Sequence, residues 1–183
     1  MNHEILIPGD VMTALRAHLF QSDLEQAAFL FAAAEERECG VQFQVTDLYL
    51  VPPSAWEIQC SVYLEMRDDE RGKILQTARA RGSAIIDCHS HPGSGGDVWF
   101  SPSDLAGITE FSRYARWKLD GKPFAALVWG EDSVDGVAWM GNFECAEALS
   151  QIVVQGTTPL ALHPRGSWFT PRRAMNRFSY EVE

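Results

Sequence analysis

The chain has 183 residues, of which 46% are apolar, and this size and composition predict an ordinary globular protein with a single well-formed core. Its formal net charge of −10 argues against broad binding to nucleic acid phosphates. No apolar run is long enough to cross a membrane, and residues 1–20 lack the apolar core of a signal peptide, so we expect a cytoplasmic protein without a membrane partner.

The four cysteines are scattered along the chain, and no two of them have Cys-x-x-Cys spacing. This pattern predicts reduced, mostly buried thiols in a cytosolic protein. The residues are Cys39, Cys60, Cys88 and Cys145.

The first half of the chain predicts a mixture of strands and helices. Asp10 can cap a first helix, with Leu15 and Leu19 in its apolar stripe, and Gly82 is a good C-terminal stop for a second. The expected elements are a strand at 5–7, a helix from Asp10, strands at 25–33 and 41–51 around a turn at 35–40, an alternating strand at 56–65 and a helix at 67–81.

The second half continues the mixed α and β pattern. Gly93, Gly95 and Gly96 allow the chain to turn sharply between a strand end and the next helix. The expected elements are a buried strand at 83–87, a helix at about 102–119 and a hairpin whose strands are 124–129 and 137–140.

The run His89-Ser90-His91-Pro92 follows the buried strand directly. Because strand side chains alternate between faces, His89 and His91 should point to one side and Cys88 to the opposite core. Asp87 shares the side of His89 and is either a carboxylate partner of its imidazole or a solvated acid at the strand end. Two imidazoles and one nearby carboxylate would give three protein ligands and an open fourth position, which is typical of a catalytic zinc.

The run Ser101-Pro102-Ser103-Asp104 supplies a carboxylate one short loop later. It is also a good helix start, with Ser101 as N-cap, Pro102 at the first helical position and Asp104 three residues after the cap. Asp104 is therefore either a metal ligand or only a capping residue. The combination of strand, histidine pair, Gly-rich loop and acid-bearing helix start favours the metal.

At these residues the chain resembles the JAB/MPN metalloprotease family, also called JAMM proteases, whose pattern is an upstream Glu, His-x-His-Pro, a short loop and Ser-x-x-Asp. The resemblance covers about residues 3–142. It implies an α/β, three-layer MPN/JAB fold (cytidine-deaminase-like) with a mixed central sheet flanked by helices. The expected domain spans 1–145, followed by a C-terminal extension at 146–183. One departure is the loop of nine residues between His91 and Ser101, which is longer than the family's usual loop.

The resemblance also implies a role for each site residue. His89, His91 and Asp104 match the ligands of the cofactor, Zn2+. Ser101 matches the residue that steadies the bound water and the tetrahedral intermediate. Glu25 matches the upstream glutamate, a general base that does not bind the metal.

The choice of Glu25 depends on residues 22–36, whose sequence permits two structures. Ser22 and Glu25 have the spacing of a capping box, and the Ala, Leu, Gln and Glu content favours a helix. The resemblance implies a buried strand instead, with Glu25 at its start. The remaining candidates, which we expect to be solvated, are Glu35, Glu36 and Glu65.

Family members with this pattern commonly hydrolyse the isopeptide or peptide bond after the C-terminal glycine of ubiquitin or a ubiquitin-like protein. The resemblance therefore implies a zinc metallopeptidase with a ubiquitin-like partner. A compact chain of this kind is similar to bacterial JAB proteases found with ubiquitin-like conjugation genes, which implies conjugation enzymes of the same operon as further partners and a role in antiviral defence. Processing of sulfur-carrier ubiquitin-like proteins and a metal-free MPN interaction module remain alternatives.

Two other zinc hydrolase classes are excluded by the residues around the histidines. A nucleoside or base deaminase needs His-x-Glu and Pro-Cys-x-x-Cys, and the chain has neither. A metallo-β-lactamase-like enzyme would need His-x-His-x-Asp-His, whereas His91 is followed by Pro92-Gly93-Ser94.

Residues 156–183 differ from the rest of the chain in combining prolines with arginines and aromatics. Such a tail on an acidic protein is either a strap packed on its own domain or a docking segment for an acidic partner or a second copy. The sequence does not decide between them.

Overall fold

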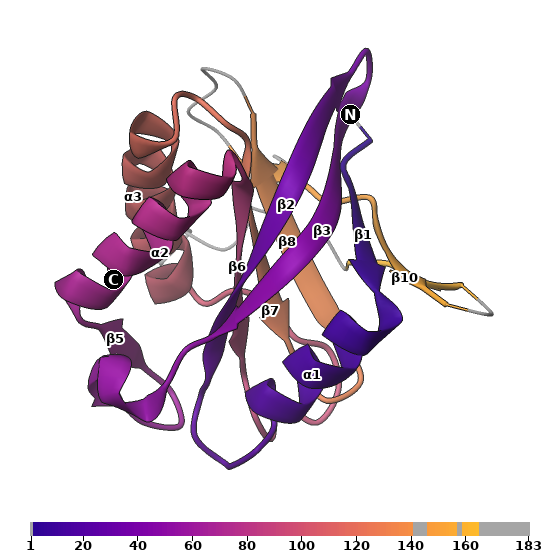
Figure 1. Ribbon diagram of the computed structural model, residues 1–183. Coiled ribbons are helices and arrows are strands. Elements are labelled where there is room, and N and C mark those ends of the chain that lie inside the picture. Colours follow the sequence, from indigo (N-terminus) through magenta and orange to yellow (C-terminus); the bar gives the residue numbers. More distant parts are fainter. Residues whose placement is uncertain (1, 141–145, 157–158, 165–183) are drawn as a thin grey trace, which may run out of the picture.

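The structure is a computed structural model that describes residues 2–140, 146–156 and 159–164. These residues form a mixed α/β fold with one large sheet, a separate two-stranded sheet and three α-helices (Figure 1). The helices are α1 (Gly9–Leu19), α2 (Asp68–Arg81) and α3 (Pro102–Lys118), with a 3-10 turn at Pro53–Ala55. The strands are β1 (Glu4–Pro8), β2 (Ala27–Arg37), β3 (Gly40–Leu50), β4 (Trp56–Gln59), β5 (Leu64–Met66), β6 (Ala84–Ser90), β7 (Phe124–Trp129), β8 (Val134–Trp139), β9 (Glu147–Ala148), β10 (Gln151–Gln155) and β11 (Leu160–Leu162).

Within the described ranges, the large sheet has nine strands in the order β11-β10-β1-β3-β2-β6-β7-β8-β9. The pairs β10–β1, β1–β3 and β6–β7 are parallel, and the other neighbours are antiparallel, so the sheet is mixed. Like most open sheets it twists, and the long strands β2 and β3 run diagonally across it (Figure 1). Strand β6 lies between β2 and β7, so the segment that carries the histidine pair is central.

Helices cover both faces of this sheet. Along β2, Ala28 and Leu30 belong to the core that includes the apolar side of α1, whereas Phe29 and Phe31 belong to the core that includes α2 and α3. This alternation follows from the period of two in a strand. The described residues therefore form two cores rather than the single core that the size of the chain predicts, because a sheet flanked by helices on both sides buries each face separately.

Residues 22–36 contain no helix, and residues 27–36 form most of strand β2. Strand β2 pairs with β3 on one side and with β6 on the other, and its first six residues are buried. This pairing and burial outweigh helix propensity, which differs among ordinary residues by only about 0.7 kcal/mol per residue. Glu25 lies two residues before the strand.

Two of the elements predicted for the first half of the chain are wrong. Residues 56–65 do not form one strand, since β4 and β5 pair antiparallel as a hairpin and the Cys60 N–H donates to the Tyr63 carbonyl at 3.0 Å. Asp10 does not cap α1, because the N-cap is Pro8 and makes no side-chain capping bond. Strand β1 ends at Pro8 and runs directly into the helix, which leaves no separate capping position for Asp10.

The described part of residues 146–164 extends the sheet at both edges. Strand β9 pairs with β8, β10 pairs with β1, and β11 pairs with β10. The buried His3 side chain lies 3.0 Å from a Glu147 oxygen, and the Ser150 N–H donates to the His3 carbonyl at 2.8 Å. The Arg- and aromatic-rich run at 165–183 lies outside the described residues.

Three cysteines lie in the described ranges, and all three are free. Cys88 is buried in the core on the α1 side, as its place in the strand predicts. Cys39 is exposed and Cys60 half-buried, so the expectation of mostly buried thiols is wrong for these two, while Cys145 lies outside the described residues. Among the described helices, none is long and apolar enough to span a membrane.

Candidate metal centre

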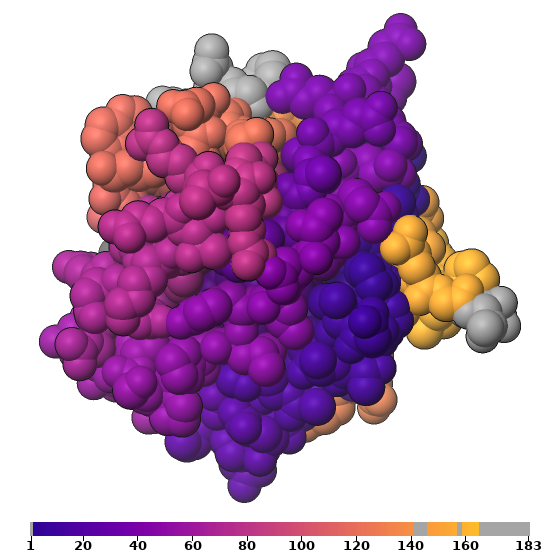
Figure 2. All heavy atoms as spheres, in the orientation of Figure 1, coloured from indigo at the N-terminus to yellow at the C-terminus, as the bar shows by residue number. Residues whose placement is uncertain are grey.

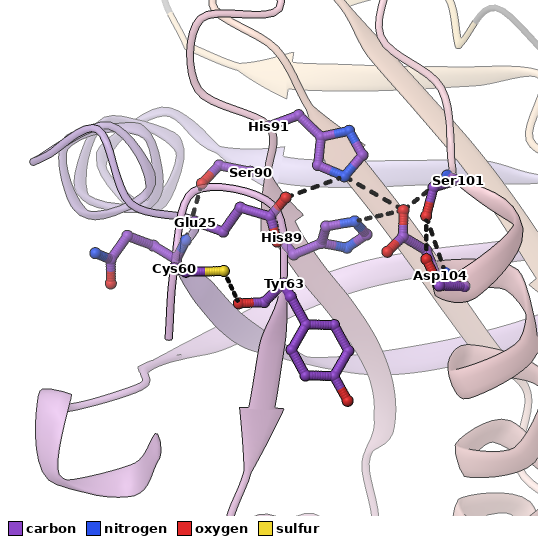
Figure 3. A network of polar contacts seen from close by, with 10 residues as sticks. Glu25, Cys60, Tyr63, His89, Ser90, His91, Ser101 and Asp104 are labelled. Carbon is purple, nitrogen blue, oxygen red and sulfur yellow. Dashed lines mark hydrogen bonds and ion pairs between the residues drawn. The ribbon is translucent and has the colours of Figure 1, made fainter. Parts of the chain in front are cut away.

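The end of β6 presents two imidazoles on one side of the sheet. His89 is in register with Ala27 of β2 and Val128 of β7, so its backbone is held from both sides. The His91 N–H donates to the Trp129 carbonyl at 2.8 Å, which fixes the residue just beyond the strand. The two ring centroids are 5.1 Å apart, and both rings point toward the start of α3 (Figure 3).

The start of α3 brings a carboxylate to these rings. Ser101 is the N-cap, and its Oγ accepts a hydrogen bond from the Asp104 N–H at 3.2 Å. In return, Asp104 Oδ2 accepts a bond from the Ser101 N–H at 2.7 Å, which completes a capping box. The same Oδ2 lies 3.3 Å from His91 Nε2 and 3.6 Å from His89 Nε2.

Three side chains from two elements therefore converge. His89, His91 and Asp104 each offer one ligand atom, and these atoms lie within 4.8 Å of one another. His89 Nε2 is buried and has no hydrogen-bond partner in the part of the chain that the structure describes, and an unpaired buried nitrogen is costly. A cation between the three atoms would satisfy it. Two imidazoles and a carboxylate are a donor set that zinc accepts, so this group could hold a metal ion.

The charges at the site depend on one another. Burial alone would raise the pKa of Asp104, but contacts with His89, His91 and Ser101 hold it well below its usual range. Burial alone would lower the pKa of His89, but the carboxylates of Asp104, Asp87 and Glu25 raise it above its usual value. Without a metal, the site therefore favours an ionised Asp104 beside a His89 that retains its proton more readily than usual.

Glu25 lies on the other side of the histidine pair from Asp104 (Figure 3). Its Oε1 is 3.6 Å from His91 Nε2, and the residue is only 5% exposed. Burial raises the pKa of the Glu25 carboxyl, and the nearby His91 and His89 reduce that rise. The upstream glutamate that was matched by resemblance is thus next to the histidines, outside the group that could hold a metal.

The other candidate glutamates lie elsewhere. Glu35 and Glu36 are exposed near the tip of the β2–β3 hairpin, which projects from the body of the molecule (Figure 2). Glu65 lies on β5 and lines a cleft next to the site. Only Glu25 of these four carboxylates contacts a histidine in the described structure.

A cleft of about 630 Å³ leads to the site. The β4–β5 hairpin forms one side, and α2 and α3 contribute the others, with His89, Asp104 and Glu25 among the lining residues. Asp87 also lines it, and burial raises the pKa of its carboxyl to about 6 in spite of the nearby His89 and Arg71. The lining side chains of the hairpin are Trp56, Tyr63, Leu64, Glu65 and Met66.

Sequence reasoning missed three features of the site. Ser103 lines the cleft, and its Oγ lies 2.8 Å from Ser101 Oγ, although the motif draws attention only to Ser101. Ser90, between the two histidines, bonds to Gln26 next to Glu25. The β4–β5 hairpin binds the backbone of Glu25. The spacing Ser-x-Ser was a visible signal for Ser103. The contact of Ser90 with Gln26 and the contact of the hairpin with Glu25 depend instead on pairing between distant segments.

No family model matches the chain, and a search of curated proteins finds no match either. The interpretation of the site therefore rests on its own geometry. In that geometry, a possible metal position, a buried carboxylate and an open cleft lie side by side.

Proposed function

We propose that the protein is a zinc-dependent peptidase or isopeptidase with the MPN/JAB fold, which cleaves after the C-terminal glycine of a ubiquitin-like protein. The observation that carries the proposal is the position of Glu25, whose buried carboxylate faces the His89–His91–Asp104 group without belonging to it. A metal site with an adjacent buried base is the arrangement that metal-assisted hydrolysis requires.

The residues have distinct tasks in this reaction. His89, His91 and Asp104 would hold the zinc, which supplies Lewis-acid activation of water and of the scissile carbonyl when bound. Glu25 takes a proton from the attacking water on its carboxylate and returns it to the leaving amine, and its raised pKa brings it closer to neutral pH. The Ser101 hydroxyl accepts a bond from the Asp104 N–H and lies 2.8 Å from the Ser103 hydroxyl, and its proton would be donated to the developing oxyanion.

The cleft supports an extended polypeptide as substrate. The β4–β5 sheet has only two strands among the described residues, so its outer edges are free of sheet partners there. A substrate segment can add to such an edge with main-chain hydrogen bonds. A tail that ends in glycine suits this approach, because it brings no side chain to the scissile bond.

The biological setting follows from the same proposal. Partners would be a ubiquitin-like protein and the enzymes that conjugate it, in a bacterial antiviral system. Processing of a sulfur-carrier ubiquitin-like protein uses the same bond and the same site.

The test combines metal analysis with cleavage. The purified chain should contain about one zinc, and His89→Ala combined with Asp104→Ala should remove it. The zinc-loaded chain should cleave a ubiquitin-like domain fused through its C-terminal glycine to a reporter peptide. Full metal retention by the double variant would exclude this metal site. Stoichiometric zinc with no cleavage of any such fusion would exclude the proposed substrate.

A further inference from the structure

The backbone of Glu25 is held by the β4–β5 hairpin. The Glu25 N–H donates to the Cys60 carbonyl at 3.0 Å. The Gln59 side-chain amide donates to the Glu25 carbonyl at 2.9 Å. Both main-chain polar groups of Glu25 therefore bind consecutive residues of one hairpin, and Figure 3 shows Cys60 and Tyr63 of this hairpin beside Glu25.

The next residue is held from the opposite direction. The Gln26 N–H donates to Ser90 Oγ, and the Ser90 N–H donates to the Gln26 carbonyl, each at 3.0 Å. Ser90 lies between the two histidines and is fully buried. The peptide at residues 25–26 is thus fixed between the histidine strand and the hairpin, and this fixes the direction of the Glu25 side chain.

We propose that Gln59 is a positioning residue for the Glu25 carboxylate, and that Gln59 and Cys60 form a clamp on its backbone. The inference rests on the proposed role of Glu25 as general base. Loss of the Gln59 bond frees the Glu25 carbonyl, so the peptide can rotate and shift the carboxylate away from the histidines. A displacement of about 1 Å at a reacting group can cost about 10² in rate.

The clamp also connects the base to the substrate cleft. Tyr63, Leu64 and Met66 of the same hairpin line the cleft, and Val62 at its tip is 80% exposed. Strands β4 and β5 pair only with each other among the described strands, and the bonds from Gln59 and Cys60 to Glu25 join this hairpin to the segment that leads into β2. A polypeptide that packs against β5 therefore contacts the element that orients Glu25.

The test uses Gln59→Met, which keeps the length of the side chain and removes the donor. Gln44→Met is the matched control, because Gln44 lies on β3 and donates to the side chain of Gln155 at 3.2 Å. With zinc content unchanged, we expect kcat of Gln59→Met to fall about 10- to 100-fold while KM stays within about twofold. Amide hydrogen exchange of the Glu25 N–H should become at least about tenfold faster. The control should change neither quantity.

A double variant separates positioning from general damage. If Gln59 acts through Glu25, Gln59→Met should add no further loss in a Glu25→Gln background. An additive loss, or an unchanged kcat in Gln59→Met, would overturn the proposal. If Gln59→Met does not fold, Gln59→Glu keeps the size and places an acceptor against the Glu25 carbonyl, and the same outcomes apply.

Failure of the proposed function gives a different result. If the wild-type chain cleaves no ubiquitin-like fusion, the hydrogen exchange data alone judge the clamp. An unchanged Glu25 amide in Gln59→Met then overturns it, and faster exchange there but not in Gln44→Met supports it.

Discussion

Asp104 is placed to serve both of the roles that the sequence presents as alternatives, helix cap and metal ligand. Its Oδ2 closes the capping box with Ser101 and lies 3.3 Å from His91 Nε2. The helix start fixes the direction of a capping side chain, so the carboxylate is already oriented toward the histidines before any metal binds. The spacing Ser-x-x-Asp is informative for this reason, since the cap and the possible ligand depend on the same geometry.

We expect Glu25→Gln to reduce hydrolysis to a small residual rate and to leave the bound zinc in place. Glu25 lies beside His91 but outside the group that could hold a metal, and loss of a general base costs about 10² to 10⁴ in rate. Turnover and zinc content of the same preparation measure the two effects. Glu35→Gln, on the exposed hairpin tip, is the control and should change neither. Near-normal turnover in Glu25→Gln would show that another group is the base.

Ser101 can be tested for its two tasks separately. Ser101→Ala should lower the free energy of unfolding by about 0.5–2 kcal/mol through loss of the cap. It should also lower turnover by about 10²–10³ with the metal retained, if the hydroxyl donates to the oxyanion. Ser101→Asp should restore the cap but not turnover, because an ionised carboxylate has no proton to donate. Thermal unfolding and cleavage rates of both variants distinguish the two tasks. Full activity in Ser101→Asp would show that Ser101 serves only as a helix cap.

At the scale of elements, the sequence predicts best where the local pattern and the tertiary environment agree. Strand β6 and helix α3 were predicted within a few residues, because a buried apolar run and a capping box are local signals. Residues 22–36 were ambiguous, since their helix propensity is local and the two flanking strands that override it are not. The break at Cys60 in residues 56–65 was missed, because no glycine or proline marks that turn.

Strand β3 and helix α2 are joined by a hydrogen bond with a consequence at high pH. The Tyr49 hydroxyl donates to Glu70, and Lys73 binds the same carboxylate at 2.8 Å. Burial first, and then Glu70, raise the pKa of Tyr49 to about 12. Because the folded value lies above the unfolded value of about 10, the contribution to stability is complete below pH ~10 and is lost as pH rises through about 12.

Tyr49→Phe should therefore destabilise the protein by about 1 kcal/mol near neutral pH, and this difference should shrink above pH ~10. Denaturant unfolding at several pH values measures it. Tyrosine ionisation can be followed by ultraviolet absorbance in the wild type and in Tyr49→Phe. The difference between the two titrations should show the ionisation of one phenol, with a midpoint at about pH 12. A midpoint near 10 in this difference would contradict the Glu70 contact.

At the scale of the whole molecule, the edges of the sheet were not predictable. Strands β9 and β11 have two and three residues, which is too short for a periodic signal, and the five residues of β10 were not predicted to form a strand. Strand β10 pairs with β1, and the two lie almost at opposite ends of the sequence. The order of the sheet therefore depends on contacts that no local window contains.

The proposed metal would join β6 to α3 and should stabilise the whole fold. Zinc that binds only the folded chain adds about 2.7 kcal/mol at a free concentration 100 times its Kd. A chelator should lower the Tm of the wild type, and His89→Ala should show no such change. Because the pKa of His89 is raised, protons compete with zinc for its imidazole. The apparent zinc affinity should therefore rise as the pH increases through the pKa of His89. An identical Tm with and without chelator would contradict this linkage.

The alternation along β6 determines which insertions and deletions the chain can accept. Ile86 and Cys88 face one core, while Asp87 and His89 face the cleft. Deletion of a single residue before His89 would turn the side chains of each set to the opposite face of the sheet. It would remove a possible metal ligand from the cleft and place a carboxylate in a core. The loop at 92–100 differs from β6, because it belongs to no strand and a change in its length shifts no strand register. The Gly93 N–H donates to the Glu131 side chain, and the Val98 N–H donates to Ser133 Oγ. Changes in chain length around this site are therefore expected to be confined to the loop, and a library of single-residue deletions should show a sharp boundary at the end of β6.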